Sequence, residues 1–164
     1  MPLCLAPKQG AANRSYSTVK DIMDYSRSLH EHARNLYEQL RDQTQKERVD
    51  MMLMLLAEHE NTLATALKDI QDGLSDKVLM EWHQFEPGSI SDALAGCGEC
   101  HPDMSVDELA AIALKIDDYM IGLYKQMLSE STSSDARRLF GNLVKLEESE
   151  KMRTVRAALS ANDW

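Results

Sequence analysis

The sequence is poor in aromatic residues and in the two residues that most often interrupt regular structure. Aromatic side chains make up 5% of its 164 residues, and it has only four prolines and seven glycines. Sheets favour aromatic and β-branched side chains, so this composition, with ten methionines, disfavours a β-sandwich and favours helices packed on helices. The length suits one domain with a substantial core.

Long apolar runs and an excess of positive charge are also missing. No segment reaches the roughly 18 to 20 consecutive apolar residues that a membrane span needs. The formal net charge of −9 repels phosphate backbones, so we expect neither a membrane nor a nucleic acid as a partner. No signal peptide is predicted within residues 1–10, and we therefore expect a cytoplasmic protein whose three cysteines are mostly reduced.

Four segments carry apolar residues at the helical period. The second should begin with a capping box of Thr44 and Glu47 and end at a left-handed Gly73, and Ser105 with Glu108 should cap the third. The predicted helices cover residues 18–42, 47–72, 105–129 and 135–159.

The segment between the second and third predicted helices is rich in turn-forming residues. It covers 74–104, long enough to cross the length of a bundle, and we expect a short helix over 78–83 with Trp82 and Phe85 anchored against the bundle. Residues 1–16 are predicted to be a flexible tail. The rest, 17–160, should be a single all-α four-helix bundle.

The chain also repeats itself at an offset of 87 residues. Tyr37 matches Tyr124 and Glu60 matches Glu147 at this offset. Each half therefore reads as one helical hairpin, and two hairpins make a four-helix bundle.

The repeat places an ionisable residue at an equivalent position in each helix. These residues are His30, Glu60, Asp117 and Glu147, and Glu150 lies one turn after the last. His30 to Glu60 and Asp117 to Glu147 both span 30 residues, which sets each pair at a similar depth in its hairpin. Carboxylates in an apolar core must share protons or bind a cation, because an unpaired buried charge is costly. Carboxylates with an imidazole suit iron or manganese, with zinc as an alternative.

These residues resemble the ferritin-like superfamily, and most closely its rubrerythrin-like branch, over residues 18–158. The likeness is carried by Ala33-Arg34-Asn35-x-Tyr37, by Leu56-Ala57-x-x-Glu60, by Asp117 seven residues before Tyr124, and by Leu143-x-x-x-Glu147. The resemblance implies a ferritin-like bundle with a long crossover between helices two and three. It also implies a di-iron carboxylate centre, built from two single Glu residues and two Glu-x-x-His motifs.

The sequence departs from that ligand set at four positions. His30 and Asp117 stand where Glu is expected, and Leu63 and Glu150 replace the two histidines. Three interpretations follow: an altered metal centre with His30, Glu60, Asp117, Glu147 and Glu150 as ligands, a site for one metal ion, or a relic that binds none.

A second group of metal-binding residue types lies in the crossover. Cys97-Gly98-Glu99-Cys100-His101 matches the short attachment signal for c-type haem, but haem attachment normally follows export. Zinc would need a fourth ligand besides Cys97, Cys100 and His101, such as Cys4 or a partner chain. A reversible disulfide and a plain turn with two free thiols are the other interpretations.

Two classes of function remain open from the sequence. One is an iron-dependent oxidoreductase that acts with oxygen or peroxide, and the other is a non-catalytic helical interaction protein that has lost its di-iron site. Whether the protein is an enzyme is therefore left open. In either case the resemblance implies a homodimer formed by helix packing.

Overall fold

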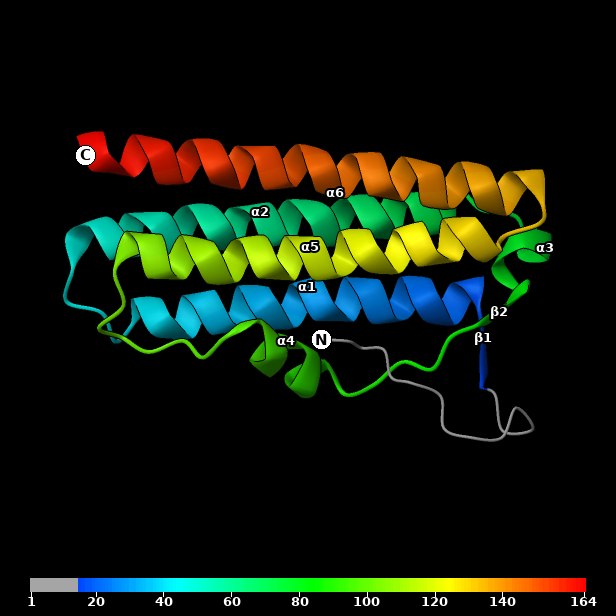
Figure 1. The fold of residues 1–164 in the computed structure, drawn as a ribbon, viewed down its shortest axis with the longest axis horizontal. Coiled ribbons are helices and arrows are strands. Elements are labelled where there is room, and N and C mark those ends of the chain that lie inside the picture. Colours follow the sequence, from blue (N-terminus) through cyan, green and yellow to red (C-terminus); the bar gives the residue numbers. More distant parts are fainter. Residues whose placement is uncertain (1–14) are drawn as a thin grey trace.

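Four long helices form the bundle in a computed structural model of the chain, which describes residues 15–164. The helices α1 (Val19–Arg41) and α2 (Glu47–Asp72) form one antiparallel hairpin, and α5 (Val106–Glu130) and α6 (Ser134–Ser160) form the other, as Figure 1 shows. A short 3₁₀ turn, Ala161–Asp163, follows α6. The predicted all-α four-helix bundle with a long crossover between its second and third long helices is confirmed.

The crossover contains three short elements. They are α3 (Asp76–Leu79), β2 (Trp82–Gln84) and α4 (Ile90–Cys97). Strand β2 pairs antiparallel with β1 (Tyr16–Thr18), which precedes α1. The prediction of a helix over 78–83 was therefore wrong beyond Leu79, because the residues of β2 hydrogen-bond to the distant strand β1. Residues 1–14 of the predicted tail lie outside the described residues.

The predicted anchors in the crossover behave differently from each other. Phe85 packs edge-on against Tyr25 of α1, with ring centroids 5.7 Å apart. Trp82 is 64% exposed, so it is not the buried anchor that the sequence predicted. Alternation along β2 explains this, because His83 takes the inward-facing position and leaves its neighbours outside.

The helix ends follow the capping rules only in part. Ser105 and Glu108 form the predicted capping box, with bonds of 3.0 and 3.1 Å. Helix α2 instead begins after Lys46 without a side-chain cap, because the Thr44 hydroxyl accepts the Lys46 backbone N–H at 3.3 Å. Gly73 has a φ of −88°, so the predicted left-handed end of α2 was also wrong.

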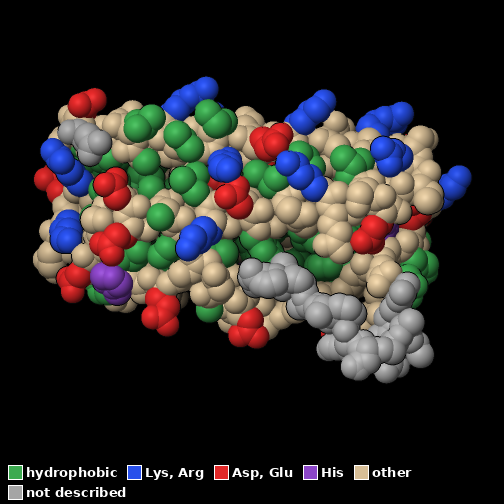
Figure 2. Space-filling view, in the orientation of Figure 1, with side chains coloured by type: hydrophobic (Ala, Val, Ile, Leu, Met, Phe, Trp, Pro, Cys, Tyr) green, Lys and Arg blue, Asp and Glu red, His purple; other side chains and the backbone are tan. Residues whose placement is uncertain are grey.

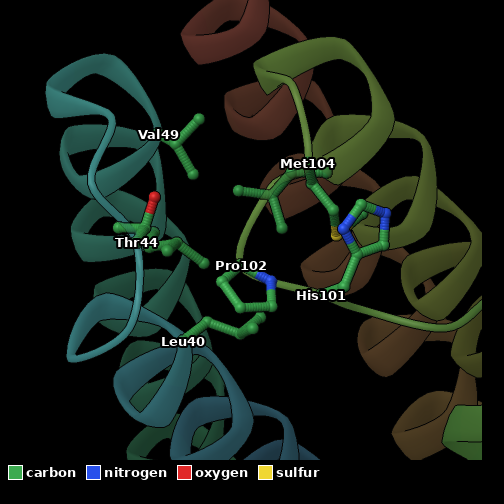
Figure 3. A pocket seen from close by; sticks show the side chains of 8 residues that line it. Leu40, Thr44, Val49, His101, Pro102 and Met104 are labelled. Atoms are coloured by element: carbon green, nitrogen blue, oxygen red, sulfur yellow. The ribbon is translucent and has the colours of Figure 1, made fainter.

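The crossover closes one end of the bundle. The Lys46 ammonium donates to the Asp103 carbonyl at 2.8 Å, and Pro102 lies between Leu40 and Val49 (Figure 3). The small depression at this place has no room for a water molecule, so it acts as packing and not as a ligand site. The contacts of Pro102 and Asp103 hold the residues that follow Cys100 against the turn between α1 and α2.

The surface carries a few exposed apolar side chains where α2 begins and α6 ends. Arg48 donates to the Trp164 carbonyl at 2.7 Å, which shows that these two ends adjoin. Met51, Met54, Met152 and Leu159 are all more than one-third exposed. In Figure 2, apolar atoms gather among basic side chains over the α6 end. Among residues 15–164, no helix combines the length and apolar character that crossing a bilayer requires.

Candidate metal centre

The centre of the bundle holds a histidine between two glutamates from different helices. His30 of α1 has Nδ1 2.6 Å from Glu60 Oε1 of α2, and Nε2 2.6 Å from Glu147 Oε1 of α6. His30 and Glu147 are fully buried and Glu60 is 3% exposed. Equal spacing in the two hairpins brings these residues to one level, as the sequence predicted. Both ring nitrogens can donate at once only in the imidazolium form.

The charges of this cluster settle the protonation of His30. Burial alone would lower the pKa of His30, but attraction to Glu147 and Glu60 overcomes burial and raises that pKa well above 6.5. Burial raises the pKa of Glu60, and the positive charge of His30 limits the rise. The imidazolium thus supplies one positive charge between two carboxylates.

Asp117 of α5 feels the charges of His30, Glu60 and Glu147 but makes no hydrogen bond to them. Burial, followed by repulsion from Glu60 and Glu147, raises the pKa of Asp117 from 3.8 to about 8. Its Oδ2 atom is buried and has no hydrogen-bond partner in the described part of the chain. Asp117 therefore keeps its proton at neutral pH in this arrangement.

Glu150 lies one turn after Glu147 at the edge of the cluster. Burial raises its pKa, while Arg153, whose Nη1 lies 3.5 Å from Glu150 Oε1, opposes that rise. Arg153 was missed by the sequence interpretation, although its three-residue spacing from Glu150 on one helix is a recognisable pairing signal. The Arg153 side chain is 56% exposed, so Glu150 lies beside a group that faces solvent.

Three carboxylate oxygens in this region are left without partners. Asp117 Oδ2, Glu147 Oε2 and Glu150 Oε2 are all buried and accept no hydrogen bond from residues 15–164. Such atoms normally find a donor, because a buried acceptor without one loses roughly 1 to 3 kcal/mol of solvation. The three oxygens come from adjacent helices, α5 and α6. They offer acceptors of the kind that a hard divalent cation binds.

A pair of metal ions does not fit these residues. The ferritin-like ligand set has six side chains, whereas this chain offers five, and the fully buried Leu63 stands where the first histidine would be. Within residues 15–164, no three His, Cys, Asp or Glu side chains converge closely enough to hold a metal ion. His30 lies between Glu60 and Glu147, the two glutamates that would have to approach a metal ion. As these side chains lie, they do not form a site for one cation either, and His30 would have to give up one of its two bonds to admit one.

The cysteine motif lies apart from this cluster. Cys97 ends α4, is 7% exposed, and its Sγ donates to the Ala93 carbonyl at 3.4 Å. Cys100 is half-buried and His101 is exposed. Cys97 and Cys100 form no disulfide among residues 15–164. The proposed zinc set of Cys97, Cys100 and His101 gains no support, since no three such ligands converge among the described residues.

Comparison with solved structures identifies the fold. A protein from Thermotoga maritima, provisionally described as a ferritin-like diiron-carboxylate protein, superposes with a TM-score of 0.59 at 17% identity, over 91% of this chain and 99% of its own. The fold is ferritin-like. A hypothetical protein from Pyrococcus furiosus matches this ferritin-like bundle with a TM-score of 0.50 at 14% identity, over 90% of this chain and 92% of that chain.

Comparison by sequence adds nothing to the ferritin-like assignment. No protein-family profile matches the chain, and no curated protein matches it. The predicted ferritin-like resemblance is thus supported at the level of fold. The rubrerythrin-like branch, the metal and the chemistry remain predictions.

Proposed function

We propose that this ferritin-like protein binds one divalent metal ion in the core of its bundle, with iron first and manganese or zinc as alternatives. The observation that supports the proposal is the set of three buried, unpartnered carboxylate oxygens on Asp117, Glu147 and Glu150. His30 and Glu60 complete the proposed ligand set, which is the set predicted from sequence.

The electrostatics of the cluster favour a cation over an empty core. Four acidic residues share this region with one imidazolium, and burial raises the pKa of Glu60, Asp117 and Glu150. A chain that needed only a stable bundle would gain by having apolar residues at these positions, because a buried ion pair often stabilises less than apolar packing. A divalent ion would allow Asp117 to ionise and would satisfy the free oxygens of Asp117, Glu147 and Glu150.

The same cluster limits the chemistry that the site can support. Bound iron would supply one-electron oxidation and reduction toward oxygen or peroxide. The side chains around it exclude water, because His30 and Glu147 are fully buried and the other proposed ligands are at most 6% exposed. Only small oxidants would reach such a site, and this supports a rubrerythrin-like oxidoreductase as the specific form of the proposal.

Metal titration of the metal-free protein tests the proposal. We expect anaerobic Fe²⁺ or Mn²⁺ to bind one per chain in calorimetry, and to raise the melting temperature. At a metal concentration of roughly one hundred times Kd, the gain is about 2.7 kcal/mol, or roughly 5 to 10 °C for a protein of this size. Glu147→Gln should abolish both effects.

Glu148→Gln is the matched control for this titration. Glu148 is the next residue on α6, and its side chain is 50% exposed. The control variant should bind metal as the unaltered protein does. Equal loss of binding in both variants, or no binding of iron, manganese or zinc by the unaltered protein, would overturn the proposed site.

A second candidate function has its own supporting observation. His30 already neutralises charge between Glu60 and Glu147 through two bonds of 2.6 Å, so the bundle can persist without metal. This favours a non-catalytic helical interaction protein with a ferritin-like fold. If iron, manganese and zinc all fail to bind and His30→Ala loses stability, the interaction protein is the better description.

A further inference from the structure

A two-stranded clasp, formed by β1 and β2, ties the start of α1 to the crossover at one end of the bundle (Figure 1). Ser17 of β1 pairs with His83 of β2. The backbone N–H of Val19, the first residue of α1, donates to the Glu81 carbonyl at 2.9 Å. The Ser17 hydroxyl donates to the Phe85 carbonyl at 2.8 Å. These contacts come from segments more than 60 residues apart, so the clasp is a tertiary contact that can open without unwinding a long helix.

The Glu81 side chain connects the clasp with the second hairpin. Both of its carboxylate oxygens lie 2.9 Å from the Ser133 hydroxyl, which can donate to either. Ser133 is the N-cap residue of α6, and its hydroxyl oxygen accepts the Ala136 N–H at 3.0 Å. The segment that carries β2 is therefore held at the start of both α1 and α6.

His83 is the inward-facing residue of β2 and lies beneath the clasp. Its side chain is 6% exposed, and its ring packs edge-on against the fully buried Phe140 of α6, with ring centroids 5.5 Å apart. The His83 Nε2 atom is buried and has no hydrogen-bond partner among residues 15–164. An imidazolium here would carry a charge and an Nε2–H without an acceptor, so this position favours the neutral ring.

Two carboxylates influence His83 electrostatically. Glu81 lies two residues earlier in the chain, and Glu130 is the last residue of α5. Burial lowers the pKa of His83 below 6.5 and outweighs the attraction of the two carboxylates, which acts in the opposite direction. The neighbours from β1 and α6, Ser17 and Phe140, carry no charge.

We propose that the β1–β2 clasp is an acid-sensitive switch, in which protonation of His83 releases the two strands from the end of the bundle. Opening the clasp gives the imidazole access to water, so each proton that it binds favours the open form. Opening also uncovers Phe140. The side chains of Tyr16, Met80 and Trp82, on or beside the strands, are already more than half exposed, so the open form presents a larger apolar surface.

The direction of the pH dependence follows from the direction of the pKa shift. The closed clasp is most stable above the pKa of His83 in the open form, and it loses stability as pH falls from there toward the lower pKa of the closed form. With an ordinary pKa of about 6.5 in the open form, the equilibrium constant for opening should rise by up to about tenfold between about pH 7.5 and about pH 5.5. The switch does not depend on the proposed metal site, because neither strand carries a proposed ligand.

Hydrogen exchange of backbone amides tests the switch in metal-free protein. Exchange is measured at these two pH values and corrected for the intrinsic exchange rate at each. The Val19 amide, which donates to Glu81 across the clasp, should lose up to about tenfold of its protection at the lower pH. Amides in the middle of α5 and α6 should keep theirs. Equal loss of protection along all the helices would overturn the inference, because it would show global unfolding.

Two histidine variants assign the effect to one residue. His83→Gln removes the proton-binding ring and keeps a neutral polar side chain, so its Val19 amide should be equally protected at both pH values. His101→Gln is the matched control, since His101 is an exposed histidine of the same crossover, and this variant should respond to pH as the unaltered protein does. Loss of protection in His83→Gln as large as in the unaltered protein would overturn the role of His83, and so would a pH-independent Val19 amide in the unaltered protein.

An NMR titration of the unaltered protein keeps the inference testable if His83→Gln does not fold. The ring signals of His83, identified by their contacts with Phe140, should shift with a midpoint below about pH 6.5, together with the Val19 amide. A midpoint at or above about pH 6.5 would overturn the switch, because the closed clasp would then bind the proton as readily as the open form does.

Discussion

Replacement of Asp117 by Asn should stabilise the metal-free protein, although Asp117 is a proposed ligand. Asp117 has a pKa of about 8 in the folded protein against 3.8 as its ordinary value. At pH 7 the unfolded chain has released this proton and the folded chain holds it. The difference of roughly three pH units, at about 1.4 kcal/mol each, destabilises the fold by up to about 4 kcal/mol.

The sign of the pH dependence follows from the direction of the shift. A group whose pKa is raised on folding stabilises the fold fully below its unfolded pKa, and this contribution is lost as pH rises toward the folded pKa. The advantage of Asp117→Asn should therefore be near zero at about pH 4 and greatest above about pH 8. Asn keeps the shape of the side chain and cannot ionise in either state.

Urea unfolding with a chelator present measures this effect. The free energy of unfolding of Asp117→Asn should exceed that of the unaltered protein by about 2 to 4 kcal/mol near pH 7, and the gap should narrow toward pH 5. Added Fe²⁺ or Mn²⁺ should reverse the order, since the unaltered protein alone keeps the full ligand set.

The neighbouring residue Asp118 provides the control for this series. Asp118 is exposed and accepts a hydrogen bond from Lys151 at 2.6 Å. Asp118→Asn should change stability by less than about 1 kcal/mol, because exposed ion pairs contribute little. A gap between Asp117→Asn and the unaltered protein that does not vary with pH would show that Asp117 is already ionised in the fold, and would refute the reasoning.

Three further predictions each concern the replacement of one residue. His30→Ala should lower the free energy of unfolding by about 3 to 5 kcal/mol at neutral pH in urea titrations, since Glu60 and Glu147 lose their buried partner; a loss below about 1 kcal/mol would contradict an imidazolium there. Gly98→Ala should cost about 1 to 3 kcal/mol by thermal unfolding, because of its φ of +137° and the 2.8 Å approach to Ile112; unchanged stability would show that the turn rearranges freely. The expected homodimer should dissociate in Met54→Lys, measured by sedimentation, if it uses the exposed methionines of α2; an unchanged sedimentation coefficient would exclude this face.

The amino-acid sequence by itself determined the four helices and the level at which their ionisable residues meet. Apolar periodicity sets which face of each helix is buried, and equal spacing in two hairpins brings His30 to Glu60 and Glu147. These properties are local or nearly so, because a short turn between antiparallel helices leaves little freedom of register. For the same reason the capping box at Ser105 could be read directly from the sequence.

Tertiary structure alone decided how the polar groups of the core are paired. The sequence left open whether carboxylates share protons or bind a cation, and only packing shows His30 donating to both glutamates while three carboxylate oxygens stay free. Strand β2 was likewise beyond local prediction, because its partner β1 lies more than 60 residues earlier in the chain. Hydrogen-bond pairing depends on contacts between distant segments, and side-chain spacing within one helix does not encode it.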